Sequence, residues 1–297
     1  MTFASRACCK WVANVKSTPL ALVAAHPAAY VGATHSRFSA VNPPRERIFN
    51  VPGAVLALVA LLVAIHLIMD YALTDQQQSE VLSLFAFSPA RYGEVVPRWL
   101  PAWWGPQLWT FVSYAFFHAN FPHLIFNLIW LMAFGPPIAR RFGPLRFLIF
   151  CAATAPAAAA HHITHLGELA PMIGASAAVS GTMAAAMRFV FQHGGPLGWL
   201  GRGDDEDSYR VPAAPLSAML RDPRIMAFLA VWFGVNFIFG MGAVTMPGTE
   251  GTVAWQAHIG GFLAGLLGFA LFDPVRPSEP SDGSPPITGD DEPVSRQ

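Results

Sequence analysis

Six long apolar runs constrain the fold of this chain more than any other feature of its sequence. Each is about 20 residues long, and they cover residues 52–72, 115–134, 144–164, 172–192, 224–241 and 253–272. A helix needs about 20 predominantly apolar residues to cross the roughly 30 Å hydrocarbon core of a bilayer. With 54% hydrophobic and only 12% charged residues, the chain is also too apolar for an ordinary soluble domain. We therefore predict an all-α membrane protein with six transmembrane helices.

The distribution of positive charge predicts the orientation of these helices. Of the 18 Lys and Arg residues, only Arg91 and Arg98 fall in the loops that follow the first, third and fifth runs. By the positive-inside rule, both termini are expected in the cytoplasm. The formal net charge is zero, so the overall charge does not indicate a nucleic-acid partner, and none is expected.

Composition divides the chain into three parts. Residues 1–50 are basic, with Glu46 as their single acid, and indicate a flexible cytoplasmic arm, although an acid-poor start is also typical of an organellar transit peptide. Residues 51–273 hold the six apolar runs and form the predicted membrane domain. Residues 274–297 are rich in Pro, Ser and acids, which indicates a disordered cytoplasmic tail.

Polar side chains occur at a similar predicted depth on three of the helices. The outer half of the second run carries His118, His123 and Asn127, the outer end of the fourth carries Ser176, and the sixth carries His258 near its outer end. Such side chains are costly in a bilayer unless they face the protein interior or a water-filled cavity. We therefore expect these side chains to face one another inside the protein.

Small residues offer a way to bring the fourth and sixth helices together. Ser176, Ser180 and Ala184 form a stripe on the fourth helix, and Gly261 and Gly265 form a GxxxG pattern on the sixth. Stripes of this kind let two helix backbones approach closely. The predicted contact would bring the serine at the outer end of the fourth helix beside the histidine of the sixth.

This arrangement has the parts needed for acyl transfer. A serine hydroxyl is a poor nucleophile without a neighbouring base, and histidine is a suitable base. The oxyanion that forms also needs hydrogen-bond donors, which His123, Asn127 and the backbone N–H of Ser176 could supply.

The sequence resembles the rhomboid intramembrane serine proteases, and the segments "LWTFVSYAFFHANFPHLIFN", "RFLIF" and "IGASAAVSG" especially resemble the alphaproteobacterial branch. Three features carry the resemblance, in the family's order and spacing: His118-x4-His123-x3-Asn127, Gly174-Ala-Ser176, and Ala257-His258 followed by Gly261. The resemblance covers residues 52–273 and implies a six-helix rhomboid bundle.

The resemblance also implies a function and a set of roles. Ser176 would be the nucleophile and His258 the general base of a dyad that cleaves transmembrane segments of other proteins. His123 and Asn127 would line the oxyanion hole, and His118 would be structural or assist at the outer rim. No cofactor or metal is implied, and the expected location is a bacterial inner membrane, with a mitochondrial inner membrane as the alternative.

Three positions depart from the family's pattern. Ala177 follows the serine where glycine is common, and Ser180 stands where many members carry a tyrosine that supports the base. Ala139 replaces the acid often found after the second helix. Gly174, Ala177 and Ser180 are therefore candidate supporting residues, and the residue that holds His258 is left open.

Other interpretations compete with proteolysis. A catalytically inactive rhomboid-like protein would bind membrane clients, but such members characteristically lose the serine or the histidine. A transporter would favour charged residues near the middle of the membrane, and no acid lies there. His161 and His165 could bind a metal but are expected to meet water or headgroups, and Asn236 is expected to form a hydrogen bond between helices.

Overall fold

The computed structural model describes residues 50–93, 96–101, 103–164, 171–198, 205–242 and 254–275. The predicted N-terminal arm, up to residue 49, and the predicted tail, from residue 276, lie outside these ranges. Within them the chain is helical, and its only strand-like feature is an isolated antiparallel bridge between Phe87 and Met172. The helices are α1 (Gly53–Ala72), α2 (Asp75–Phe85), α3 (Trp104–Ser113), α4 (Phe121–Phe142), α5 (Pro144–Thr164), α6 (Ser176–Ala186), α7 (Leu216–Met219), α8 (Pro223–Gly240) and α9 (Trp255–Phe272).

Each of the six apolar runs overlaps one of these helices. In the described part of the chain, α1, α4, α8 and α9 are long and apolar enough to cross a bilayer, and α5 is apolar over Pro144–Ala160. The outward-facing side chains fit a lipid environment, since α8 and α9 expose apolar residues such as Val231 and Leu271. The all-α membrane fold predicted from the sequence is therefore correct.

Helix α4 begins later than the sequence suggested. The run at 115–134 predicted a helix that includes His118, but the structure starts α4 at Phe121. The Asn120 side chain accepts a hydrogen bond from the backbone N–H of His123, which caps the helix, and Pro122 occupies the first turn. His118 therefore lies in the segment before α4, so the geometry of that helix does not fix where its ring points.

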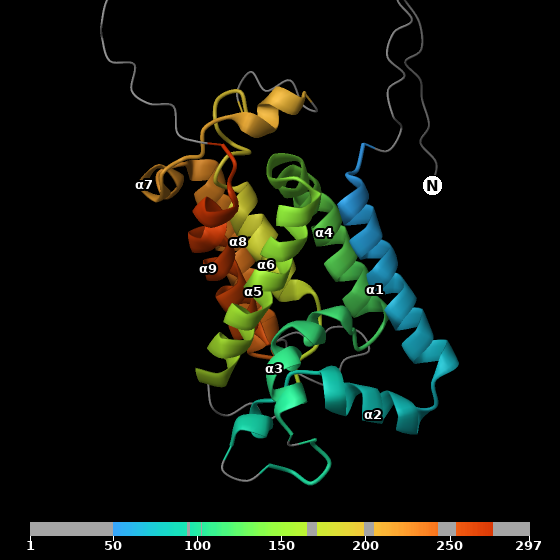
Figure 1. Ribbon diagram of the computed structural model, residues 1–297. Coiled ribbons are helices and arrows are strands. Elements are labelled where there is room, and N and C mark those ends of the chain that lie inside the picture. The colour runs from blue at the N-terminus through green and yellow to red at the C-terminus, as the bar shows by residue number, and fades with distance from the viewer. Residues whose placement is uncertain are drawn as a thin grey trace, which may run out of the picture. The chain divides into compact units, whose positions relative to one another are not determined.

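Helix α6 lies at the centre of the bundle, in contact with α4, α5 and α9 (Figure 1). It is only 11 residues long, and every residue after Ser176 is buried. Its sequence, SAAVSGTMAAA, explains this position, because small side chains let three other helices approach it.

The contact between α6 and α9 uses a different stripe from the predicted one. A Cβ atom added to Gly261 would overlap the Ala177 carbonyl oxygen, and one added to Gly265 would overlap that of Gly181. The close approach therefore runs along Ala177 and Gly181, one position away from the predicted stripe of Ser176, Ser180 and Ala184. Both pairs advance by four residues, so α6 and α9 run parallel.

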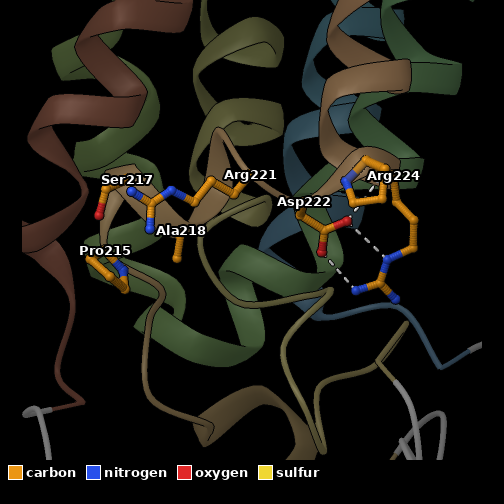
Figure 2. A pocket seen from close by; sticks show the side chains of 7 residues that line it. Pro215, Ser217, Ala218, Arg221, Asp222 and Arg224 are labelled. Atoms are coloured by element: carbon orange, nitrogen blue, oxygen red, sulfur yellow. Dashed lines mark hydrogen bonds and ion pairs between the residues drawn. The ribbon is translucent and has the colours of Figure 1, made fainter.

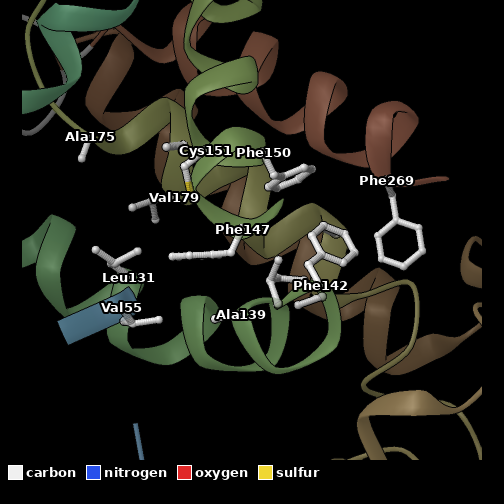
Figure 3. Close-up of a cluster of buried hydrophobic side chains, with 14 of the residues drawn as sticks. Val55, Leu131, Ala139, Phe142, Phe147, Phe150, Cys151, Ala175, Val179 and Phe269 are labelled. Atoms are coloured by element: carbon white, nitrogen blue, oxygen red, sulfur yellow. The ribbon is translucent and has the colours of Figure 1, made fainter. Parts of the chain in front are cut away.

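A cluster of buried apolar side chains joins the helices around α6 (Figure 3). It draws on α1, α4, α5, α6 and α9, with members that include Val55, Leu131, Phe142, Phe147, Phe150, Val179 and Phe269. Ala139 belongs to this cluster and is 4% exposed. An acid at that position would need a partner in these apolar surroundings, so the departure from the family's pattern suits the local packing.

Candidate active site

Ser176 is the first residue of α6, and the segment before it is held by backbone hydrogen bonds. Met172 pairs with Phe87 through bonds of 2.7 and 3.1 Å, and the Gly174 N–H donates to the Tyr114 carbonyl at 3.0 Å. Gly174 has a φ of 123°, which side-chain-bearing residues rarely adopt. This glycine lets the chain turn from the bridge into α6, so the serine stands at the helix N-terminus.

Gly174 also brings His123 and Ser176 to the same place. A Cβ atom added to Gly174 would lie 2.8 Å from both Cε1 and Nε2 of His123, and 3.8 Å from the Ser176 Oγ. The imidazole edge therefore packs directly on the glycine, on the side where the serine hydroxyl lies. The N–H of Ala119 donates to His123 Nδ1 at 3.4 Å, so in the neutral ring Nε2, the atom beside Gly174, carries the hydrogen.

His118 also contacts this segment. Its Nε2 accepts a hydrogen bond from the Ala175 N–H at 3.4 Å, directly before the serine. Its ring lies 5.1 Å from that of His123, and the residue is 7% exposed. Its Nδ1 has no hydrogen-bond partner among the residues that the structure describes. His118 thus links the segment before α4 to the residue that precedes Ser176.

Asn127 lies one turn further along α4. Its Nδ2 donates to the carbonyl of His123 at 2.9 Å, and the residue is 5% exposed. One of its two amide hydrogens is thereby used within the helix. Asn127 and the partly buried His123 are four residues apart, so they lie on the same face of α4.

His258 lies on α9 at the level of the serine. Gly261 of α9 meets Ala177 of α6, so in parallel helices a residue one turn before Gly261 lies level with the segment just before Ser176. The Nδ1 atom of His258 lies 2.5 Å from Oδ1 of Asn236 on α8. No hydrogen bond joins Ser176 Oγ to His258 within the described residues, and catalytic hydrogen bonds are often loose before substrate binds.

The candidate supporting residues take different places. Ala177 contributes its carbonyl to the contact with α9, and Ser180 is buried on α6. The residue beside His258 is Asn236, which the sequence indicated only as a bond between helices. The sequence did not predict that Asn236 contacts His258, because the spacing of the two residues does not reveal which faces of α8 and α9 meet.

The hollows on the surface of the described residues include two that differ in their position relative to the candidate site. One, of about 510 Å³, is lined by Ile173 of the segment before the serine and by residues that include Ser83, Ser88 and Trp99. The second, of about 620 Å³, is lined by residues of α7 and of the start of α8 (Figure 2). There the Arg224 guanidinium hydrogen-bonds to Asp222 and holds the pKa of that carboxyl below its usual value. Only the first hollow is next to the candidate site.

The described residues contain no group of three His, Cys, Asp or Glu side chains placed to hold a metal. The side chains of His161 and His165 lie outside the described part of the chain, so the prediction for them is not tested.

Known proteins are similar to this chain in sequence. The family model for the Rhomboid domain matches residues 105–201, which include His118, His123, Asn127 and Ser176. The rhomboid protease GlpG of Pectobacterium atrosepticum is 28% identical over 182 residues, which cover 59% of this chain and 51% of that protein. The GlpG proteins of Serratia proteamaculans and Yersinia pestis are 24% and 26% identical over 163 and 162 residues, each covering 54% of this chain and 47% of the relative.

The chain thus spans about half the length of the curated relatives it matches. The matched domain holds the second to fourth apolar runs, and the fold around it is an all-α membrane bundle. Residues 105–201 thus match the Rhomboid domain, and the chain is similar to bacterial rhomboid proteases.

Proposed function

We propose that this protein is an intramembrane serine endopeptidase that cleaves transmembrane segments of other membrane proteins. The observation that carries the proposal is the placement of Ser176 at the N-terminus of α6, beside the His123 ring and level with His258. The GlpG relatives, which are named as proteases, support it.

In this proposal Ser176 and His258 form the catalytic dyad. The Ser176 Oγ attacks the scissile carbonyl carbon while His258 Nε2 takes the hydroxyl proton. The same nitrogen then gives the proton to the leaving amine, which leaves an acyl group on the serine. His258 next removes a proton from water, and the resulting attack releases the acid and restores the serine.

Donors on two elements would stabilise the oxyanion. The first N–H groups of a helix lack partners within the helix, so those of Ser176 and Ala177 are available in principle at the start of α6. The His123 Nε2 atom of α4 lies against the neighbouring Gly174. Asn127, one turn below, is the further donor that we assign to the oxyanion.

The substrate must present an extended segment to this site. A carbonyl within a regular helix is occupied by a hydrogen bond and shielded by the helix, so the substrate helix must unwind locally before attack. We therefore expect helix-weakening and small residues near the cleaved bond. Helix α8 is the least buried of the four long apolar helices, and we propose it as part of the lateral entry route.

We also propose a multi-pass position in a bacterial inner membrane, in line with the bacterial relatives, with both termini in the cytoplasm. The competing proposal is an inactive rhomboid-like protein that binds membrane clients. It is favoured by one observation, the lack of a hydrogen bond between the Ser176 hydroxyl and His258 within the described residues.

The test is cleavage of a transmembrane substrate by the purified protein in liposomes, together with labelling by a fluorophosphonate and mass spectrometry. Wild type is expected to cleave and to be labelled on Ser176, whereas Ser176→Ala and His258→Ala should not cleave. Ser217→Ala is the control, since it removes an exposed hydroxyl on α7 that belongs to no candidate site residue. A folded wild type that neither reacts with the probe nor cleaves any of several substrates would favour the client-binding protein.

A further inference from the structure

The contact between Asn236 and His258 joins α8 to the histidine that we assign as the base. It is short, with 2.5 Å between Oδ1 and Nδ1, and Asn236 is only 9% exposed. A buried polar side chain on a largely lipid-facing helix is costly unless its hydrogen bonds are made. On α8 the buried Asn236 side chain meets this requirement by facing His258.

A second hydrogen bond of Asn236 determines which of its atoms faces the imidazole. The Nδ2 group donates to the Trp232 carbonyl one turn earlier in α8, at 2.8 Å. The amide oxygen must therefore be the atom that faces His258. Because an amide oxygen can only accept, His258 Nδ1 must carry the hydrogen.

That tautomer leaves the other ring nitrogen, Nε2, without a hydrogen. A general base needs such a nitrogen to accept the serine proton, and the identity of the protonated nitrogen is set by the partner of the other one. The same division of roles operates where an acid orients the histidine of a catalytic triad. Here the orienting group is neutral.

We propose that Asn236 is a positioning residue for His258, taking the place of the tyrosine that Ser180 replaces. The inference rests on the proposed function, and deepens it. In the reaction the proton of Ser176 Oγ moves to His258 Nε2, and the Nδ1–H stays in place and donates to the Asn236 oxygen throughout. Asn236 neither gains nor loses a proton.

Packing between α8 and α9 holds the amide in place. The Trp232 and Phe262 rings stack with their centroids 4.9 Å apart, at an interplanar angle of 29°. Further along the seam, Gly240 contacts the Trp255 side chain so closely that no Cβ atom would fit. These contacts lie on either side of Asn236 along α8, so they restrict its distance from α9.

Two substitutions at Asn236 test the proposal. Asn236→Leu has nearly the same size but no acceptor, and it should lower kcat about 10- to 100-fold with little change in KM, since a buried donor loses its partner. Asn236→Asp keeps an oxygen at the same reach and should recover most of that loss. Leu267→Ala, at an exposed position of α9 outside the proposed entry route, is the control and should match wild type.

Thermal unfolding of each variant in the same detergent separates a folding defect from an effect on the base. Equal kcat for Asn236→Leu and wild type would overturn the proposal. If Asn236→Leu does not fold, Asn236→Ala is compared with Asn236→Asp, and equal kcat for those two would overturn it as well.

A measurement that needs no proteolysis separates this inference from the proposed function. In protein labelled with ¹⁵N-histidine, the His258 signals, assigned by their loss in His258→Ala, should show hydrogen on Nδ1 in wild type and a mixture of tautomers in Asn236→Leu. Hydrogen on Nε2 in wild type would overturn the inference even if the enzyme is active. The expected tautomer in a protein that never cleaves would contradict only the proposed function.

Discussion

At the scale of single residues, Gly174 is the position where backbone conformation and the candidate site are most closely coupled. Gly174→Ala places a methyl group against the His123 ring, 2.8 Å from two of its atoms, on a backbone with a φ of 123°. We expect strain of about 1–3 kcal/mol and a displaced His123. Cleavage per folded molecule should fall at least about tenfold, by the relation between barrier and rate.

Gly143→Ala is the matched control for this prediction. Gly143 also has a positive φ, 80°, but a Cβ atom there would meet nothing within 4 Å. It should lose stability and keep its activity per folded molecule. Equal effects of the two substitutions on the rate of cleavage would contradict the argument.

The candidate site residues could be selected from the sequence because polar groups are expensive in a bilayer. His118, His123, Gly174 and Ser176 were selected in this way or by resemblance, and the structure brings these four together. The contact between Asn236 and His258 could not be derived, because it depends on the rotation of α8 about its own axis. The roles of all these residues remain predictions.

At the scale of helices, the close contact between α6 and α9 depends on Gly261 and Gly265, where no Cβ atom would fit. Gly265→Ala would drive a methyl group into the Gly181 carbonyl, so the two backbones would have to separate. Overpacking of this kind costs about 1–3 kcal/mol. We expect a lower temperature of thermal unfolding and reduced cleavage, since His258 and Ser176 are on the two separated helices.

Gly268→Ala provides the comparison on the same helix. A Cβ atom at Gly268 would meet nothing within 4 Å, and alanine favours a helix by about 1 kcal/mol over glycine. This variant should be as stable as wild type or more so. Loss of stability in Gly268→Ala equal to that in Gly265→Ala would show that the close contact with α6 is not the cause.

Helix existence was predictable from the apolar runs, whereas helix boundaries and the facing stripes were not. Hydropathy does not reveal that Asn120 caps α4, which moved the start of the helix past His118. It also does not distinguish the stripe of Ala177 and Gly181 from that of Ser176 and Ser180, because both consist of small residues. The two stripes differ by a rotation of α6 about its axis by one residue position, which the small side chains permit.

At the scale of the whole molecule, a buried arginine connects parts of the chain that are remote in sequence. Arg141, at the end of α4, contacts both carboxylate oxygens of Asp273 at 2.8 and 2.9 Å, just after α9. It also donates to the carbonyls of Tyr209 and Val211, at 2.7 and 2.8 Å. Its guanidinium lies over the Phe189 ring at 4.5 Å. The sequence did not indicate this connection, since an arginine at the end of an apolar run usually signals only orientation.

Arg141 and Asp273 should therefore affect stability together. Arg141→Met leaves Asp273 buried without its partner, which costs about 3–5 kcal/mol when one member of a buried pair is removed. The segment around Tyr209 and Val211 loses two hydrogen bonds as well, so limited proteolysis should cut there faster than in wild type. The free energy of unfolding, measured by titration with SDS, should fall for either single variant.

The double variant Arg141→Met with Asp273→Leu separates the ion pair from the other contacts of Arg141. Removing both charges abolishes the cost of an unpaired carboxylate. The free energy of unfolding of the double variant should therefore exceed that of Arg141→Met alone. Recovery should be partial, because the carbonyls of Tyr209 and Val211 still lack their donor. Strictly additive losses in the cycle would mean that the pair does not couple the ends of α4 and α9, and full recovery would mean that the two carbonyl contacts contribute nothing.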